Sequence, residues 1–288
     1  MTSLILNADD FGLTPGVNQS VLDLHRAGAL TSATLMATAD HAGSAAAIAG
    51  GDPTLGVGCH VILVDGKSAL PHDSIPALTL PSGTFRTTLG TFVLDLMRGS
   101  IPEAEIEMEA VAQIRHLQAA GARVSHLDTH KHTHMFPRVL RPLLRAAVSC
   151  GVSAVRNPFE PDWALKATPH AARLRRLQVH LLRTQRQEFL KLVRRAGLDT
   201  TDGAIGVLAT GTLNSGTLEA LLTAMPAGTW ELVCHPGYID EDLNNIQTRL
   251  RESRAIEHAA LLETIPPFLN RHREIAPVNF GQIREHIA

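Results

Sequence analysis

The 288-residue chain is poor in cysteine, in aromatic residues and in net charge, and these shortages exclude several classes of protein. Its three cysteines, Cys59, Cys150 and Cys234, are an odd number with no CxxC spacing, which argues against a disulfide framework and fits a reducing compartment. A formal net charge of −2 gives no basic footprint for nucleic acid or for an anionic membrane. No apolar run approaches the roughly 20 residues that span a bilayer, and no basic-then-apolar signal segment opens the sequence. We therefore expect a cytoplasmic protein with no nucleic-acid partner and no transmembrane segment.

Hydrophobic residues, in contrast, make up 44% of the chain, which is enough apolar material for a large core. Short apolar runs alternate with helical patterns along the whole length, as in SLILNADD followed by PGVNQSVLDLHRAGAL. Such alternation predicts parallel strands joined by right-handed helical crossovers. No linker, repeat or low-complexity tract divides the sequence, so we expect one domain over residues 1–288. The predicted fold is α/β, a single TIM-like (β/α) barrel, regular or distorted, with seven or eight parallel strands.

A doubly wound open sheet is the structural alternative to the barrel. No GxGxxG motif follows the first predicted strand, so a Rossmann cofactor site has no support. The stretch around 64–90 carries scattered Pro, Gly and Ser, which predicts a long active-site loop or lid. Further along the chain we expect helices over 101–121, 136–151, 164–197 and 249–264, and a last strand over 275–280.

Acidic residues and histidines gather where the predicted strands end. In a barrel of parallel strands, the active site lies at the carboxyl ends of the strands. The first strand ends in Asp9 and Asp10, the third carries His60, and a late strand ends in CHPGY with His235. A further strand runs into VSHLDTHKHTHMFP, where four histidines and an aspartate occupy nine positions. Four separate strands thus deliver carboxylates or imidazoles to one rim.

Strand alternation sorts the residues of this histidine-rich stretch. His126, Asp128 and His130 fall on one face, and His130, at the strand end, is best placed to face a site at the rim. His126 and Asp128 lie deeper, where they could fix the orientation of a metal-binding ring. His132 and His134 fall in the following turn, where both substrate contact and helix entry are open.

Each of these signals has an ordinary structural explanation when taken alone. An Asp–Asp pair after a strand is often a helix N-cap with its neighbour, a lone His60 is more often a core residue, and His235 before Pro-Gly fits a turn. Because all of these aspartates and histidines lie at predicted strand ends, together they favour a metal site. One carboxylate and two histidines bind a catalytic divalent metal, and imidazole favours zinc or another transition metal, since magnesium prefers oxygen ligands. The remaining carboxylate and histidine could then act as general base and general acid of a metal-assisted hydrolase.

The motifs NADDFG, GVGCHVIL, HLDTHKHTHMFP and HPGY resemble, in order and spacing, those of the YdjC-like (ChbG/HpnK) carbohydrate deacetylases, and the resemblance covers residues 4–262. It implies a barrel-like hydrolase that uses one divalent metal ion, Zn²⁺ or Mg²⁺, to remove the acetyl group from an N-acetylated sugar such as a chitooligosaccharide. The implied partner is therefore a small acetylated sugar. The resemblance also allows a homodimer, for which no pattern in the sequence argues.

The resemblance assigns roles to individual residues. Asp10, His60 and His130 match the metal-binding positions. Asp9 matches the catalytic base, and His235 would be the acid that protonates the departing amine.

Two further positions bear on the substrate. Arg156, in AVRNP, matches an arginine that would contact the sugar or brace Asp9. Lys131 departs from the commonest pattern of the family and adds a cation beside the metal rim. This HKH form, together with VILVDGKSALP and SGTFR, is more similar to the hopanoid-associated (HpnK) branch, which is thought to deacetylate an N-acetylglucosaminyl group on a hopanoid lipid.

Two rival functions stand beside the expected carbohydrate N-deacetylase. A metal-dependent phosphoesterase or another amidohydrolase on a similar barrel would commonly gather two metals and more carboxylates than Asp9, Asp10 and Asp128. A non-catalytic glycan-binding protein would keep the pocket without turnover, but binding alone needs neither Asp9 nor His235.

Overall fold

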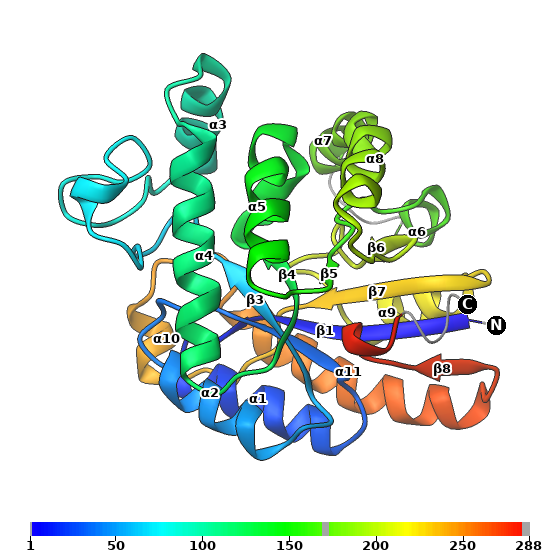
Figure 1. The fold of residues 1–288 in the computed structure, drawn as a ribbon. Helices are drawn as coiled ribbons and strands as arrows, with labels where there is room; N and C mark the ends of the chain where they lie inside the picture. The colour runs from blue at the N-terminus through cyan, green and yellow to red at the C-terminus, as the bar shows by residue number, and fades with distance from the viewer. Residues whose placement is uncertain (1, 169–172, 284–288) are drawn as a thin grey trace.

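The strands of this protein run parallel and lie side by side in one eight-stranded sheet, with helices around it (Figure 1). The computed structural model describes residues 2–168 and 173–283. The strand order is β5-β4-β3-β2-β1-β7-β6, and β8 pairs with the start of β1. The strands are β1 (Thr2–Phe11), β2 (Ser32–Leu35), β3 (Gly56–Val61), β4 (Val124–Thr129), β5 (Ala154–Val155), β6 (Gly203–Ile205), β7 (Gly228–Cys234) and β8 (Ile275–Pro277).

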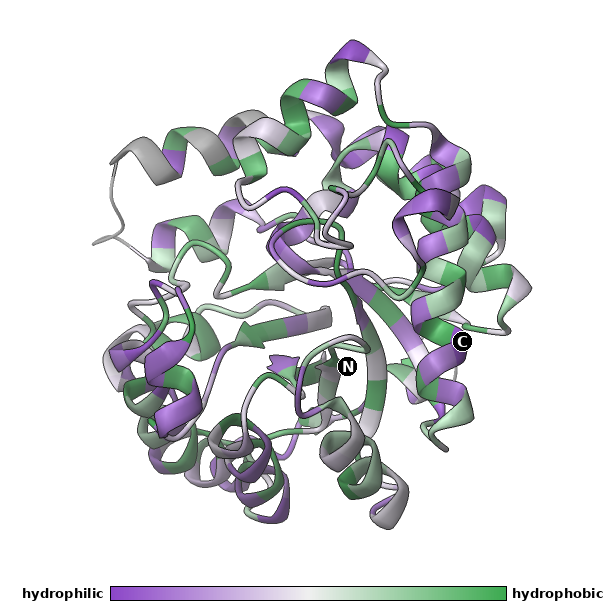
Figure 2. Ribbon diagram, turned by 90° about the vertical axis from the view of Figure 1, so that its left-hand side faces the viewer, coloured by the Kyte–Doolittle hydropathy of each residue, from purple (hydrophilic) through white to green (hydrophobic). Residues whose placement is uncertain are grey.

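Helices connect successive strands and surround the sheet, as a view turned by 90° shows (Figure 2). The helices are α1 (Pro15–Arg26), α2 (Ala42–Gly51), α3 (Leu89–Arg98), α4 (Glu103–Ala119), α5 (Pro137–Ser149), α6 (Asp162–Ala167), α7 (Arg173–Leu182), α8 (Arg186–Ala196), α9 (Ser215–Thr223), α10 (Glu241–Asn245) and α11 (Glu252–Arg271). The short 3₁₀ helices are η1 (His72–Ser74), η2 (His130–Met135), η3 (Arg183–Gln185) and η4 (Phe280–Gln282). No helix in the described ranges is both long enough and apolar enough to cross a membrane.

The sheet curves into a barrel that is left open between its two end strands. β5 and β6 do not pair with each other. The gap is bridged by the chain before β6, where Asp199 forms a β-bridge with Ala154 and Thr200 Oγ1 donates a hydrogen bond to the Val155 carbonyl at 2.7 Å. β8 occupies the edge of β1 below β2, so the last strand lengthens the sheet without closing it. The predicted fold class is confirmed, in its distorted form.

Alternation along β1 divides the core. Leu4, Leu6 and Ala8 belong to the large hydrophobic cluster between the sheet and the helices. On the opposite face Ile5 packs in a second cluster with Val278 and Phe280, beside the start of the strands. The next two positions on that face are the buried Asn7 and Asp9. The barrel interior therefore changes from apolar to polar along the strand direction, and the polar end is where the strands finish.

Local sequence signals set the helix ends as expected in α1. Thr14 Oγ1 accepts a hydrogen bond from the Val17 amide at 3.2 Å, Pro15 is the first helical residue, and Gly28 takes a left-handed φ of 72° after the last turn. Elsewhere the tertiary structure overrides such signals. α11 continues past the predicted end at residue 264 and through two prolines, because its inner face buries Ile265 and Phe268.

The segment between β3 and α3 is a long loop, as expected, but it is firmly held. Carboxylate oxygens of Glu109 accept hydrogen bonds from the amides of Ala69 at 2.7 Å and Leu70 at 3.1 Å. Glu105, one turn earlier on α4, accepts from the amides of Ala77 and Leu78, both at 2.9 Å. These contacts tie the loop to α4, and its role as an active-site loop or lid stays a prediction.

Three other elements differ from the sequence-based expectation. No helix is predicted between residues 90 and 101, yet α3 forms there, because Thr88 caps it and Phe92 and Leu96 are buried on one face. The predicted last strand over 275–280 is reduced to β8, followed by η4. The helical region predicted over 164–197 comprises α6, α7 and α8, and its residues 169–172 lie outside the described residues.

Candidate metal and catalytic site

Asp9 and Asp10 are neighbours, yet both line the same cavity at the end of β1. Regular strand alternation would send two consecutive side chains to opposite faces. Asp10 instead has a left-handed φ of 63°, and the pairing of β1 with β2 shifts register between Ala8 and Phe11. Aspartate tolerates this backbone region better than most residues, and such outliers gather at functional sites. The break in β1 therefore brings two carboxylates to one place.

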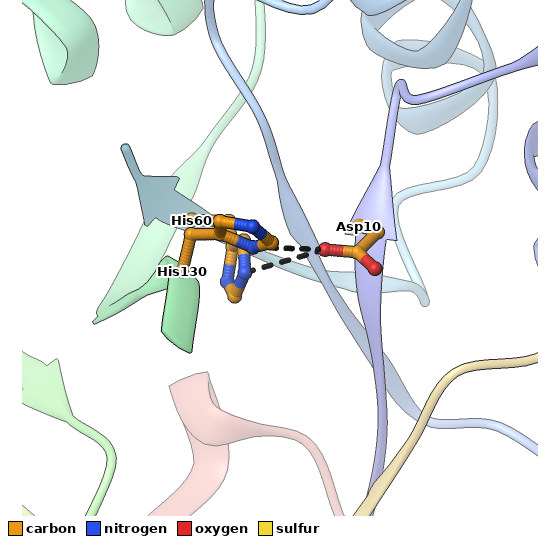
Figure 3. A group of neighbouring side chains, drawn as sticks. All are labelled: Asp10, His60 and His130. Carbon is orange, nitrogen blue, oxygen red and sulfur yellow. Dashed lines mark ion pairs between the residues drawn. The ribbon is translucent and has the colours of Figure 1, made fainter. Parts of the chain in front are cut away.

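Three candidate metal ligands converge above the strand ends (Figure 3). Oδ1 of Asp10 lies 3.5 Å from His60 Nε2 and 3.4 Å from His130 Nδ1. One ligand atom from each of the three residues lies within 4.8 Å of the others. Asp10 Oδ1 is also buried and accepts no hydrogen bond from any described residue. One buried carboxylate oxygen without a hydrogen-bond donor and two imidazole nitrogens together form a donor set that binds a divalent metal. These residues therefore fit the ion.

A second cluster, Asp9, His60 and Asp128, is equally close in space. Its carboxylates already have a cation. The guanidinium of Arg156 donates to both oxygens of Asp9, at 2.7 and 3.0 Å, and forms an ion pair with Asp128. Because Arg156 engages both oxygens of Asp9, whereas Asp10 Oδ1 has no hydrogen-bond donor among the described residues, the arrangement favours a single metal ion with Asp10, His60 and His130 as its candidate ligands.

Asp128 orients His60. His60 Nδ1 lies 2.7 Å from Asp128 Oδ1, and a carboxylate can only accept, so Nδ1 carries the proton and Nε2 faces Asp10. Thr34 Oγ1 lies 3.3 Å from the same Nδ1 and donates to Asp9 at 3.2 Å. Burial alone would lower the pKa of His60, but Asp128 and the other nearby carboxylates raise it to about 9. Asp128 thus contacts the ring of the candidate ligand His60, in the position from which the sequence predicts that it could orient a metal-binding ring.

Arg156 braces Asp9. Its Nε donates to Glu231 Oε1 at 2.8 Å, so one guanidinium binds carboxylates from β1, β4 and β7. Burial alone would raise the pKa of Asp9, but Arg156 and two nearby imidazoles hold it well below its usual value. The side chain of Arg156 has no exposed surface. Of the two roles left open by the sequence, the structure therefore supports the bracing of Asp9 and leaves no surface for sugar contact.

His235 lies beside Asp9 in the wall of the cavity. Its Nε2 lies 3.6 Å from Asp9 Oδ2, and its backbone amide donates to Glu257 Oε2 at 2.6 Å. Burial lowers the pKa of His235 to about 4, against the opposing effect of the two aspartates. A carboxylate and an imidazole thus flank the space in front of the candidate metal ligands, which is the arrangement that acid–base catalysis at one bond needs.

Comparison with known proteins places the chain in a family. The YdjC-like protein family matches residues 3–266. The chain belongs to this family. A carbohydrate deacetylase from Halalkalibacterium halodurans is 30% identical over 271 residues, which cover 91% of this chain and 98% of that relative. One from Brevibacillus brevis is 42% identical over 156 residues, which cover 54% of this chain and 59% of that relative.

The fold is shared with a solved structure from Enterococcus faecalis V583, of a protein whose suggested role is cellobiose-phosphate cleavage. The TM-score is 0.77 and the identity 24%, and the likeness covers 98% of each chain. At this level of identity the likeness shows that the two proteins share a fold.

The remaining predicted residues of this YdjC-like site divide into two groups. His132 and Lys131 line the cavity, and both have left-handed backbones, with φ of 52° and 58°. Lys131 Nζ pairs with Asp65 at 2.7 Å, which ties η2 to the long loop. His126 and His134 do not reach the cavity. The sequence cannot separate these cases, because the left-handed turn ends strand alternation directly after His130.

His126 and His134 are fully buried, and burial lowers the pKa of each ring well below its usual value. His126 stacks on Phe280 with 3.9 Å between ring centroids, one layer below Asp128. His134 Nδ1 lies 2.7 Å from Thr129 Oγ1. Neither ring lines the cavity, so a role of these two histidines in the site stays a prediction.

Sequence reasoning misses several residues of the site. Thr34 lies in an unremarkable apolar strand, and Glu231 follows a tryptophan in β7. Arg254 and Glu257 lie on α11, where a helical pattern makes them look like solvated charges, yet both are buried. Arg254 NH2 donates to Asp10 Oδ2 at 2.5 Å. The Arg254–Asp10 contact joins α11 to β1, and it becomes visible only in the three-dimensional structure.

The cavity has a volume of about 440 Å³ and mixed walls. Leu13, Met36 and Leu250 give it apolar surface, while the candidate catalytic residues form its polar floor. The segment 246–250, which precedes α11, covers one side. Arg251 fixes this segment by donating to the carbonyls of Leu243, Asn244 and Ile246.

Proposed function

We propose that this YdjC-like protein is a metal-dependent carbohydrate N-deacetylase, which hydrolyses the acetamido group of an N-acetylated sugar and releases acetate. The observation that carries the proposal is the convergence of Asp10, His60 and His130 around an unpartnered carboxylate oxygen, with Asp9 and His235 on the walls of the same cavity. The relatives named as carbohydrate deacetylases support the substrate class.

Asp10, His60 and His130 would hold the metal. When bound, a divalent ion polarises the amide carbonyl and lowers the pKa of a water molecule to about 7. Two imidazoles and one carboxylate favour Zn²⁺ or another transition metal over Mg²⁺.

Asp9 and His235 would move the protons. Arg156 keeps Asp9 ionised, so Asp9 can take a proton from the attacking water. Asp9 Oδ2 lies 3.6 Å from His235 Nε2, so Asp9 can pass this proton to His235 once the water oxygen has bonded to the acyl carbon. The C–N bond then breaks as His235 donates the same proton to the nitrogen. The products are acetate and a free amine on the sugar. Arg156 and Glu257 orient the two groups through the contacts described above.

The finer substrate class is a chitooligosaccharide or an N-acetylglucosaminyl lipid of the hopanoid type. The mixed polar and apolar walls of the cavity suit a sugar ring, whose edges are polar and whose faces are apolar. Comparing the two substrates at equal concentration decides between them.

The decisive experiment combines metal analysis with an acetate-release assay over a panel of acetylated sugars. We expect one metal ion per chain, acetate release from an N-acetylglucosamine conjugate, loss of activity with a chelator and recovery on adding metal. Two metals per chain together with hydrolysis of a phosphate ester would favour the phosphoesterase. Binding of acetylated sugars without acetate release would favour the glycan-binding protein.

A further inference from the structure

Arg254 is a buried arginine that forms an ion pair with a single carboxylate. Its side chain is 1% exposed, and NH2 donates to Asp10 Oδ2 at 2.5 Å. Nε and NH1 are buried and find no hydrogen-bond acceptor among the described residues. Arg156, in contrast, binds carboxylates on three strands. Because burying unsatisfied donors is costly, the one contact that Arg254 does make calls for an explanation.

This contact gives the two oxygens of Asp10 different surroundings. Oδ2 accepts from Arg254, whereas Oδ1 faces the imidazoles of His60 and His130 without a hydrogen bond from any residue that the structure describes. A carboxylate can offer a metal one oxygen or both. With Oδ2 engaged by a charged donor, only Oδ1 is left to offer.

We propose that Arg254 is a positioning residue that limits Asp10 to one oxygen toward the metal and so keeps a coordination position free for the water and the amide. The inference rests on the metal site of the proposed function. It adds a residue to that site, and a reason why its ligand Asp10 would coordinate through Oδ1 alone.

The fold fixes Arg254 in place. The Arg254 carbonyl accepts a hydrogen bond from the Gly237 amide at 3.2 Å. A Cβ added at Gly237 would lie 3.1 Å from Arg254 Cδ and 3.4 Å from Arg254 Cβ, so the glycine of HPGY leaves room for the arginine stem. The guanidinium stays charged throughout the physiological pH range. Asp10 is thus held from two sides, by its left-handed backbone and by Arg254.

Metal retention alone does not explain this arginine. A fixed cation beside a bound metal ion repels it, so Arg254 opposes metal affinity. Its benefit must lie in how Asp10 is presented. Groups that orient metal ligands commonly change affinity or activity 10- to 100-fold when they are removed.

The test replaces Arg254 with Met, which fills similar space without donating, and with Lys, which restores one charged donor. Co²⁺ is added to each full-length protein, because the intensity of its visible absorption falls as the coordination number rises. We expect Arg254→Met to bind one Co²⁺ with affinity equal to or above wild type, with a weaker absorption band. Its kcat for acetate release should be about 10- to 100-fold lower, with KM little changed. Arg254→Lys should recover most of the wild-type spectrum.

The control is Arg141→Met, which removes an arginine that pairs with Glu103 outside the cavity, and it should keep the wild-type spectrum. A wild-type spectrum for Arg254→Met would overturn the inference, and so would a spectrum of Arg254→Lys indistinguishable from that of Arg254→Met. Arg254→Gln takes the same test should the Met variant not fold. Spectral changes as expected in a protein that never releases acetate would leave the role of Arg254 standing and refute the proposed deacetylase. A wild-type protein that binds no Co²⁺ would refute both.

Discussion

Ion pairs between buried residues of opposite charge hold the individual side chains of this site in place. One guanidinium, that of Arg156, joins Asp9, Asp128 and Glu231, and Asp128 in turn orients His60. Removing one member of such a network leaves the others buried without a partner, which costs more than the lost contact itself. Individual substitutions at the cavity therefore need a readout of folding beside the readout of activity.

Asp10 and His130 should be indispensable for metal binding. Asp10→Ala or His130→Ala removes one of three candidate ligands, so we expect loss of the bound metal and of acetate release together, measured by elemental analysis and the acetate assay. The matched control is His134→Ala, since His134 belongs to the same sequence cluster but does not line the cavity. A metal-free His130→Ala protein with full activity would contradict the proposed mechanism.

His235 should matter for turnover and not for metal retention. Its ring faces Asp9 and is not one of the clustered ligands. For His235→Ala we expect one metal per chain and a rate of acetate release lower by about 10²-fold or more, the usual scale for a lost acid–base group. His258→Ala, on α11 outside the cavity, serves as control. An unchanged rate would show that another group delivers the proton.

At the scale of elements, the positions of the strand ends could be read from the sequence, while the contacts between elements could not. Asp9, His60 and His235 are visible because each ends or follows an apolar run. Arg254 is invisible, because the helical periodicity of α11 does not show which face meets β1. The left-handed turn at Asp10 is equally hidden, because aspartate occurs in many ordinary strands and caps. Strand alternation places His126 deeper in the barrel than His130, but only the structure shows that its ring stacks on Phe280.

The loop between β3 and α3 depends on α4 for its order. Glu109 accepts two loop amides and is fully buried. Glu109→Ala should leave these donors unsatisfied and lower the free energy of local unfolding by about 1–3 kcal/mol. Hydrogen exchange at the Ala69 and Leu70 amides should accelerate accordingly.

Glu107, two residues earlier on α4, is the control for this experiment, because it pairs with Arg145 and contacts no loop amide. Glu107→Ala should leave exchange at Ala69 and Leu70 unchanged. Slow exchange at these amides in the Glu109→Ala protein would show that the loop is ordered by other contacts.

At the scale of the whole molecule, the candidate ligands tie together strands that are distant in sequence. Asp10 lies near the end of β1, His60 lies in β3, and His130 follows β4. A metal that binds all three only in the folded state stabilises that state by mass action, by about 2.7 kcal/mol when the free ion is at 100 times its Kd. We therefore expect Zn²⁺ to raise the Tm of the chelator-treated protein by several degrees.

The Asp10→Ala protein is the reference for this measurement and should show no comparable rise in Tm with Zn²⁺. An equal rise in both proteins would place the stabilising ion elsewhere on the molecule.

The apolar layer of Ile5, Val278 and Phe280, with His126 stacked above it, seals the end of the barrel where the strands begin. In the proposed deacetylase, the substrate would therefore enter and the products leave at the opposite end of the barrel, where the cavity lies.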